Sequence, residues 1–398
     1  MIPVGAMPNR RVLRAVRERR GLGLAQVASF TTISPDRLQQ FEEGEKEPSR
    51  KQMEKLADTY GVPLYSLFND NVPNLPPLPQ DFRKSDPSPA SLTPRGIRTL
   101  LSSERISQFT QQLAVELNYK PADLAPTVRI AKTPKRRATE LRNAFDAWLE
   151  PRVAALNFTG APEHRFMSAL RLFFEVQGGV LNVNDAPSDD YMGFFLEPEA
   201  GRPTIFVNRS ISSRKAQLFT LAHEYSHALL GADGISNPFM PRNSIERECN
   251  VFAAEFLAPM GTFSRIVEAL PQSTRSEVAR FVDAAASSTL LSKHATAIRL
   301  LEGDYITQQQ FRGWRRIFTA NPRFEKEEEK EASEGGAGGV PHAKRLSELG
   351  HLPVALAKRA VDARLIDSSD VADGIGLSLT LQDRAYSLAT RRFHTALT

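Results

Sequence analysis

Two histidines, His223 and His227, stand four residues apart in the segment TLAHEYSHALLG (residues 220–231). Because four residues make about one helical turn, both imidazoles leave the same face of a helix and can bind one Zn²⁺ about 2.0 to 2.1 Å from each nitrogen. Glu224 follows the first histidine and is then placed to hold a metal-bound water rather than the metal. The spacing predicts a zinc site. The alternative is an ordinary helix with two incidental histidines.

A third protein ligand must come from another part of the chain. The longer pattern HExxHxxGxxH does not occur, because position 230 is Leu and position 233 is Asp. Asp233 could replace that third histidine, but Gly231 and Gly234 predict that the helix ends first. A carboxylate from a second helix is therefore the better candidate.

The second helix is predicted over the segment IERECNVFAAEFLAP (residues 245–259), which contains three glutamates. At about 100° per residue, its apolar face is centred on Cys249, Phe252 and their neighbours, with Glu246 at the margin. Glu248 and Glu255 lie together on the opposite side, where we expect solvent. Glu246 is the candidate third ligand. The alternative is a glutamate that is favoured at this helix end by the macrodipole.

Short β-type runs precede the histidine segment. They cover residues 179–183, 191–196 and 203–208 and are separated by turn-rich stretches, so we predict a small antiparallel sheet. The helices that carry the histidines and Glu246 would pack beside it. This part of the chain is therefore predicted to be an α+β domain.

The histidine segment and the IERECNVFAAEFLAP helix together resemble the ImmA/IrrE family of intracellular zinc metallopeptidases. The hallmark of that family is HExxH followed by a helix that reads ExxxN-x-(F/V)AAExL-x-P. The preceding PTIFVNRSISSRKAQLF is similar to the family's strand and the entry to its active-site helix, so the resemblance covers about residues 135–320. It implies a zincin-like fold in which His223, His227 and Glu246 bind the metal and Glu224 is the catalytic base.

The resemblance also implies the chemistry, which is hydrolysis of a peptide bond. Three protein ligands leave a fourth position open, where Zn²⁺ lowers the pKa of bound water to about 7. Mn²⁺ or Co²⁺ could occupy the same ligand set. We expect the strand at 191–196 to present its edge to an extended substrate. His294 and Tyr305 are candidates for a second oxyanion donor, although packing is the favoured role for His294.

The amino-terminal residues 13–68 resemble a helix-turn-helix domain of the XRE (Cro/phage-repressor) type, built from five short helices. The predicted recognition helix, residues 34–41, carries Arg37, Gln39 and Gln40 as candidate DNA contacts. Glutamine can read adenine edges, whereas Asp36 on the same helix would oppose phosphate binding. DNA binding is favoured, and a protein-interaction or autoregulatory role is the alternative.

Length and composition predict a multidomain, mainly α-helical protein. The chain has 398 residues, a net charge of +5, which permits a nucleic-acid partner, and one cysteine, which fits a reducing cytosol. It has no apolar run of about 18 residues and no secretory signal, so a membrane partner is not expected. The predicted units are a helix-turn-helix domain (8–70), a proline-rich linker (71–96), a peptidase domain with a helical lead-in (97–262), a helical region resembling a helix-turn-helix (263–320), an acidic and glycine-rich linker (321–340) and a small helical module (341–398).

Two functions from different classes follow. The first is a cytoplasmic zinc endopeptidase that cleaves a helix-turn-helix transcriptional repressor, in stress response or in the regulation of mobile elements and phages. The alternative is a DNA-binding regulator whose peptidase-like domain senses a metal or ligand without proteolysis. The partners expected are a repressor protein and DNA, and a homo-oligomer is compatible with either function.

Overall fold

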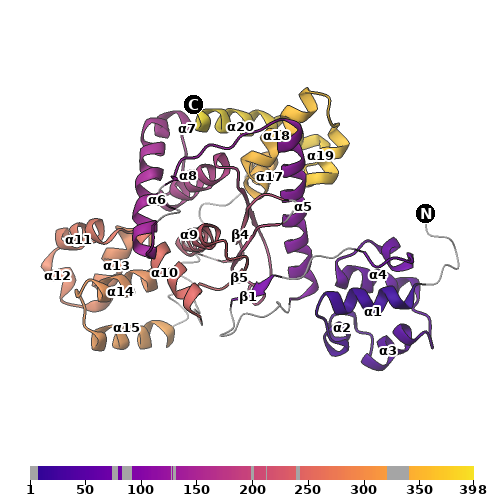
Figure 1. Cartoon of the computed structure of the whole chain (residues 1–398). Coiled ribbons are helices and arrows are strands. Elements are labelled where there is room, and N and C mark those ends of the chain that lie inside the picture. Colours follow the sequence, from indigo (N-terminus) through magenta and orange to yellow (C-terminus); the bar gives the residue numbers. More distant parts are fainter. Residues whose placement is uncertain are drawn as a thin grey trace.

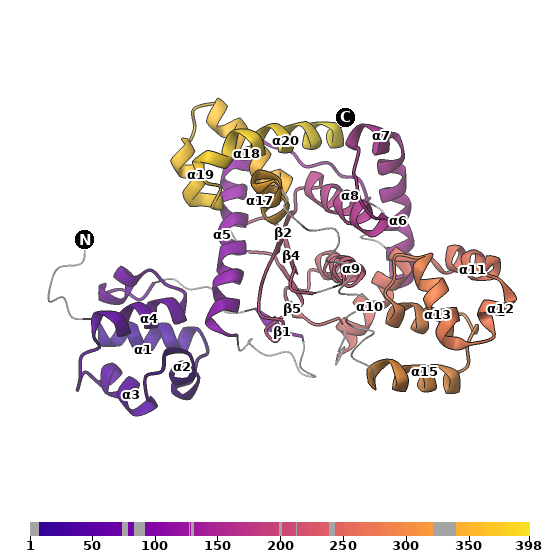
Figure 2. The ribbon, with the colours of Figure 1, turned by 180° about the vertical axis from the view of Figure 1, so that it is seen from behind.

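A computed structural model describes residues 8–73, 79–82, 92–126, 128, 131–198, 201–211, 213–238, 243–320 and 340–398, with the side chains of 319 and 320 excepted. The described chain is mainly helical around one small sheet, with a helical bundle at the amino terminus and helices at the carboxy terminus (Figure 1, Figure 2). The predicted fold class is confirmed. The predicted acidic and glycine-rich linker (321–340) lies outside the described residues except for its last residue, and so does most of the proline-rich linker.

The amino-terminal bundle forms where the sequence predicts it. Side chains of Asn9, Ser34 and Ser49 cap three of its helices by accepting hydrogen bonds from first-turn amides. The bidentate pair between Arg17 and Glu42 (2.6 and 2.8 Å) joins the first helix to the third. The fifth predicted helix is a short 3-10 turn. The elements are α1 (Arg10–Arg19), α2 (Leu24–Thr31), α3 (Pro35–Glu43), α4 (Arg50–Tyr60) and η1 (Leu64–Phe68).

The sheet at the centre of the chain is mixed, whereas the sequence predicted an antiparallel one. Among the described residues its strands are β1 (Gln80–Asp81), β2 (Val180–Asn184), β3 (Gly193–Leu196), β4 (Thr204–Asn208) and β5 (Gly234–Ser236), in the order β1-β5-β3-β4-β2. β3 is antiparallel to β4 and β5, while β2 runs parallel to β4 and β1 runs parallel to β5. The prediction of direction fails because residues 185–192 carry the chain past the position that β4 later fills, so β2 and β3 are not neighbours.

Helix α9 (Arg214–Leu230) packs on β3 and β4, and helix α10 (Ser244–Leu257) packs on α9. Ser213 caps α9 by accepting from the Ala216 amide, and Gly231 ends it in the left-handed conformation (φ +62°). The helix therefore stops before Asp233, as predicted. Asn243 caps α10 by accepting from the amide of Glu246 (2.9 Å).

Further helices enclose the sheet. Figure 1 and Figure 2 both show the strands between α9 and the long α5, which contacts β2 and β4. The helices before the sheet are α5 (Pro94–Glu116), α6 (Pro134–Leu149), η3 (Glu150–Arg152), α7 (Val153–Leu156) and α8 (Pro162–Val176). On the side of α10 lie α11 (Met260–Ala269), α12 (Gln272–Arg275), α13 (Val278–Ser287), α14 (Lys293–Glu302) and α15 (Gln308–Ala320).

The carboxy-terminal helices share the hydrophobic core of the sheet domain. They are α17 (Pro341–Leu349), α18 (His351–Asp362), α19 (Ser368–Ile375) and α20 (Leu379–Leu397), and they pack on α5, α8 and β2. The indole of Trp148 donates to the carbonyl of Ala396 (3.0 Å), and the side chain of Asn182 donates to the carbonyl of Leu349 (3.1 Å). Residues 341–398 thus cover one edge of the sheet rather than standing apart from it.

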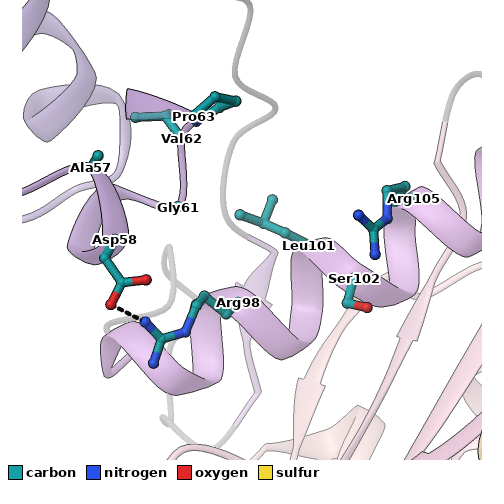
Figure 3. A pocket seen from close by; sticks show the side chains of 9 residues that line it. All are labelled: Ala57, Asp58, Gly61, Val62, Pro63, Arg98, Leu101, Ser102 and Arg105. Carbon is teal, nitrogen blue, oxygen red and sulfur yellow. Dashed lines mark ion pairs between the residues drawn. The ribbon is translucent and has the colours of Figure 1, made fainter. Parts of the chain in front are cut away.

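The amino-terminal bundle docks on the first turns of α5. Gly61, in the left-handed conformation (φ +65°), lets the chain approach Leu101 closely: a Cβ at this position would lie 2.5 Å from the leucine side chain. Asp58 forms an ion pair with Arg98. Figure 3 shows these residues around a groove of about 460 Å³ between the bundle and α5. Every helix within the described ranges is too short or too polar to cross a lipid bilayer.

Candidate metal centre

The structure brings together the two histidines and the glutamate that the sequence singled out. His223 and His227 leave the same face of α9, and their Nε2 atoms lie 3.1 Å apart. Oε1 of Glu246 lies 3.2 Å from Nε2 of His227 and 3.5 Å from Nε2 of His223. All three side chains are at most 1% exposed. We call this group of three the His–His–Glu cluster.

Helix α10 delivers Glu246 because its first turn faces α9. The predicted inward orientation of Glu246 agrees with the structure. Glu248 pairs with Arg137 and has a side chain that is 36% exposed. The expectation that Glu255 faces solvent is wrong: its side chain is 11% exposed and forms an ion pair with Arg299 of α14. The helical-wheel argument placed Glu255 correctly on α10 but could not foresee that α14 covers that side.

The cluster fits a divalent cation. Zn²⁺ bound tetrahedrally by imidazole and carboxylate at about 2.0 to 2.2 Å would hold its ligand atoms about 3.4 Å apart, close to the separations of 3.1, 3.2 and 3.5 Å that the cluster shows. The second oxygen of Glu246, Oε2, is buried without a hydrogen-bond partner among the described groups. Such an orphaned carboxylate oxygen beside two facing ring nitrogens is costly unless a cation satisfies them.

The electrostatics of the cluster also suit a cation. Burial alone would raise the pKa of Glu246, but its hydrogen bonds with His223 and His227 lower that pKa to about 2. Burial lowers the pKa of His227, which favours the neutral imidazole that a metal requires. A carboxylate and a neutral imidazole are the ligand forms of these side chains.

Glu224 lies beside the cluster and contacts different groups. Its Oε1 accepts a hydrogen bond from the hydroxyl of Ser236 on β5, while Oε2 is buried without a partner among the described groups. Burial raises the pKa of Glu224 well above its ordinary value, against the opposite effect of Ser236. Gly193 on β3 makes room for this carboxylate, since a Cβ there would lie 2.6 Å from Oε1.

Three neighbours of the cluster were not assigned a role from the sequence. Asn250 accepts from Nδ1 of His223 (2.9 Å) and donates to the carbonyl of Pro238 (2.8 Å), so it directs the other ring nitrogen, Nε2, into the cluster. Asn250 stands at the N of the ExxxN pattern, four residues after Glu246, and this spacing could have identified it. The second neighbour is Ser236. It lies on a strand of three residues, which is too short to give a signal in the sequence.

The third neighbour is Phe82. Its ring stacks on the imidazole of His227, with centroids 5.2 Å apart and planes at 26°. Cys249 is buried, as predicted, and its sulfur and the ligand nitrogens of the two histidines all lie within 4.8 Å of one another. Burial raises the pKa of the Cys249 thiol, which keeps it protonated. The donor atoms around the cluster therefore include a thiol in addition to the predicted set.

Other sequence expectations lie elsewhere in the fold. His294 stacks on Trp314 (6.4 Å between centroids), and the hydroxyl of Tyr305 donates to Glu268 (3.3 Å), so these contacts are structural. The expectation that residues 191–196 present an edge to substrate is wrong. β3 is paired on both sides, by β4 and by β5, because the short β5 adds a strand that the sequence did not predict.

The three candidate DNA contacts lie on α3. The side chains of Arg37 and Gln39 are exposed and that of Gln40 is half-buried. The guanidinium of Arg37 lies over the ring of Phe41 at 5.6 Å, and the amide of Gln39 donates to Glu43 (2.8 Å). All three contacts remain predictions, and Gln39 would have to leave Glu43 to reach a base.

Comparison with known proteins gives two family matches and one curated relative. A model described as the IrrE N-terminal-like domain matches residues 175–300, which contain β2 to β5, α9 and α10. A model described as a helix-turn-helix domain matches residues 10–64. The chain is 36% identical over 101 residues to the HTH-type transcriptional regulator DdrOP3 of Deinococcus deserti, which covers 23% of this chain and 77% of that protein. No solved structure matches the chain.

Proposed function

Because this chain belongs to the ImmA/IrrE family and carries an XRE-type helix-turn-helix domain, we propose that it is a zinc-dependent endopeptidase that cleaves a transcriptional repressor. The observation that carries the proposal is the convergence of His223, His227 and Glu246 within 3.5 Å, with Glu224 beside them. In this proposal the first three residues are the metal ligands. Zn²⁺ is the metal that this ligand set suits best, and Mn²⁺ or Co²⁺ could replace it.

Each residue of the centre has a distinct task. A bound Zn²⁺ supplies Lewis acidity, which polarises the scissile carbonyl and makes a water molecule more acidic. Glu224 takes a proton from the attacking water and returns it to the leaving amine. The hydroxyl of Ser236 fixes Oε1 of that carboxylate, which leaves Oε2 to carry the proton. Asn250 holds His223 in the tautomer whose Nε2 lone pair faces the metal.

The helix-turn-helix domain supports the choice of substrate. A peptidase that carries such a domain can be brought to an operator by DNA contacts, or to a repressor of similar fold by protein contacts. The curated relative is named as a transcriptional regulator, which supports a role in regulation. Within this proposal, Arg37, Gln39 and Gln40 contact DNA, and the regulated response is stress or the induction of mobile elements. Assembly of the chain into a homo-oligomer is compatible with this proposal.

Substitution of the general base tests the proposal. Glu224→Gln keeps the shape of the side chain but cannot accept the proton, so we expect one zinc per chain to remain and cleavage to fall by about 10²- to 10⁴-fold. New protein amino termini, compared between cells that produce the wild type and the variant, report cleavage and identify the substrate. Glu197→Gln, at an exposed position, is the matched control. Equal cleavage by Glu224→Gln and the wild type would refute the proposed mechanism.

The alternative function, a regulator that binds metal or ligand without proteolysis, gives a different result in the same experiment. It is favoured by the complete burial of the cluster, which leaves the metal position closed to a substrate in this conformation. If Glu224→Gln retains zinc and full regulation of its target genes, the protein acts as a non-proteolytic regulator. If regulation is lost together with cleavage, the protein acts as an endopeptidase.

A further inference from the structure

A short segment between the helix-turn-helix domain and α5 lies against the candidate metal centre. Residues 80 and 81 form β1, which pairs in parallel with β5, and the Phe82 amide donates to the carbonyl of Ile235 (3.0 Å). The carbonyl of Phe82 accepts from the side chain of Asn243 (2.9 Å), the residue that caps α10. Residues 80–82 are therefore hydrogen-bonded to β5, which carries Ser236, and to the residue that caps α10, the helix that carries Asn250.

The ring of Phe82 fills a place that the surrounding residues make for it. It stacks on His227 and is only 2% exposed. Gly234 also leaves space for the ring, because a Cβ at that position would lie 2.3 Å from a ring carbon. A flat aromatic side chain therefore stacks on the imidazole and fits against a residue that has no side chain. The segment is thus seated by backbone hydrogen bonds and by one side-chain pocket.

With the segment in place, the site is closed. His223, Glu224 and Glu246 have no exposed surface, and His227 is 1% exposed. Strand β5 pairs with β3 on one side, and its other edge is already occupied by β1. A peptide bond cannot reach the cluster while the segment stays in place. The segment lies between the two matched regions, 10–64 and 175–300.

We propose that residues 80–82 occupy the position of a substrate strand, and that the enzyme opens when an extended peptide with a large aromatic side chain displaces them. The displacement by a substrate rests on the proposed endopeptidase function. The occupancy of the site by residues 80–82 does not depend on that function. The displacing peptide would pair with β5 through its backbone and stack its aromatic ring on His227, in the space that Gly234 leaves open. The segment therefore acts as an intrinsic competitor of the substrate.

The exchange of bound zinc tests the occupancy without any substrate. The full chain, loaded with one Zn²⁺, is mixed with a chelating dye, and the rate of zinc transfer is measured. Phe82→Gly removes the ring, and we expect transfer to become at least about fivefold faster, since loss of a stacked, buried ring shifts a closed–open equilibrium by that much or more. Tyr65→Ser, which changes an exposed aromatic residue of η1, is the control and should leave the rate unchanged.

A second variant guards against misfolding of the first. Gly234→Ala places a methyl group where the Phe82 ring lies and should expel the segment without altering it, so the same acceleration is expected. A synthetic peptide with the sequence of residues 78–84, LPQDFRK, should slow zinc transfer from Phe82→Gly again, and the same peptide with Ser in place of Phe should not. This pair of peptides tests the aromatic requirement directly.

The outcomes separate the two proposals. Faster zinc transfer in both variants, with no cleavage of any protein, supports the occupancy and overturns the endopeptidase function. Faster transfer together with faster cleavage supports both. Transfer within twofold of the wild type in both variants overturns the occupancy, whether or not the protein cleaves a substrate.

Discussion

The hydrogen bond between Asn250 and His223 gives the sharpest test of the metal centre. Asn250→Leu replaces the amide with an apolar group of similar size. It removes the acceptor that fixes Nδ1 of His223 and the donor to the carbonyl of Pro238. The imidazole of His223 is fully buried, so water cannot replace the lost acceptor. The ring is then free to rotate or to move its proton to Nε2, the atom that faces the cluster.

The size of the effect follows from two independent estimates. Removal of a partner that orients a metal-bound histidine lowers metal affinity by about 10- to 100-fold. A buried donor left without an acceptor costs about 1 to 3 kcal/mol, which corresponds to about 5- to 150-fold in a binding constant. The two ranges overlap. We therefore expect the zinc dissociation constant of Asn250→Leu to rise by about 10- to 100-fold.

Competition with a fluorescent zinc chelator measures this constant. The control is Asn250→Asp, which keeps an oxygen acceptor for Nδ1 of His223 but loses the donor to Pro238, and we expect it to bind zinc at least as tightly as the wild type. The thermal midpoint of the apoprotein reports any general loss of stability. If both variants weaken binding equally, the bond to Pro238 rather than the bond to His223 is responsible, and the reasoning is wrong. An unchanged constant in Asn250→Leu also refutes it.

Two further predictions concern stability. Gly61→Ala should destabilise the docking of the amino-terminal bundle by about 1 to 3 kcal/mol, because φ is +65° and the new methyl group meets a leucine of α5. The control is Gly21→Ala, where φ is +64° but the space around the new methyl group is open, so only the smaller effect of the backbone conformation is expected. Urea unfolding measures the stability of both variants. Burial would raise the pKa of Glu175, but Arg171 and His351 hold it below the ordinary value of 4.5. The stability from this lowered pKa is present above pH 4.5 and is lost as the pH falls through the folded-state pKa. Glu175→Gln should therefore cost about 3 to 5 kcal/mol at pH 7 and less at a pH below 4.5, and an equal cost at both values would contradict the assignment.

The residues of the candidate centre were accessible from the sequence because their geometry is local. A spacing of four fixes two histidines on one helical face, and the apolar face of the second helix fixes the direction of Glu246. The structure agrees on both points. The roles of these residues remain predictions. The same reasoning failed for Glu255, because its surroundings depend on Arg299, a residue that is remote in the sequence and covers α10 from another helix.

The sheet was harder to predict for a physical reason. Two of its strands, β1 and β5, have two and three residues, too few for a periodic pattern to show. Without β5, the strand at 191–196 looked like an edge. Without β1, the proline-rich stretch looked like a simple linker, although Phe82 within it contacts His227. Pairings of this length depend on tertiary contacts and leave little trace in the local sequence.

Helix α5 connects the two regions that the sequence treated as separate. Its amino terminus is held by Asp190, whose carboxylate accepts from the amide (3.0 Å) and the hydroxyl (2.5 Å) of Thr93. The next residue, Tyr191, donates its hydroxyl to the carbonyl of Gly96 (2.8 Å). These two residues lead directly into β3, where Gly193 faces the carboxylate of Glu224. Helix α5, on which the amino-terminal bundle docks, is thus hydrogen-bonded to the segment that leads into β3, where Gly193 lies beside Glu224. The position of α5 therefore constrains the position of β3 next to the general base.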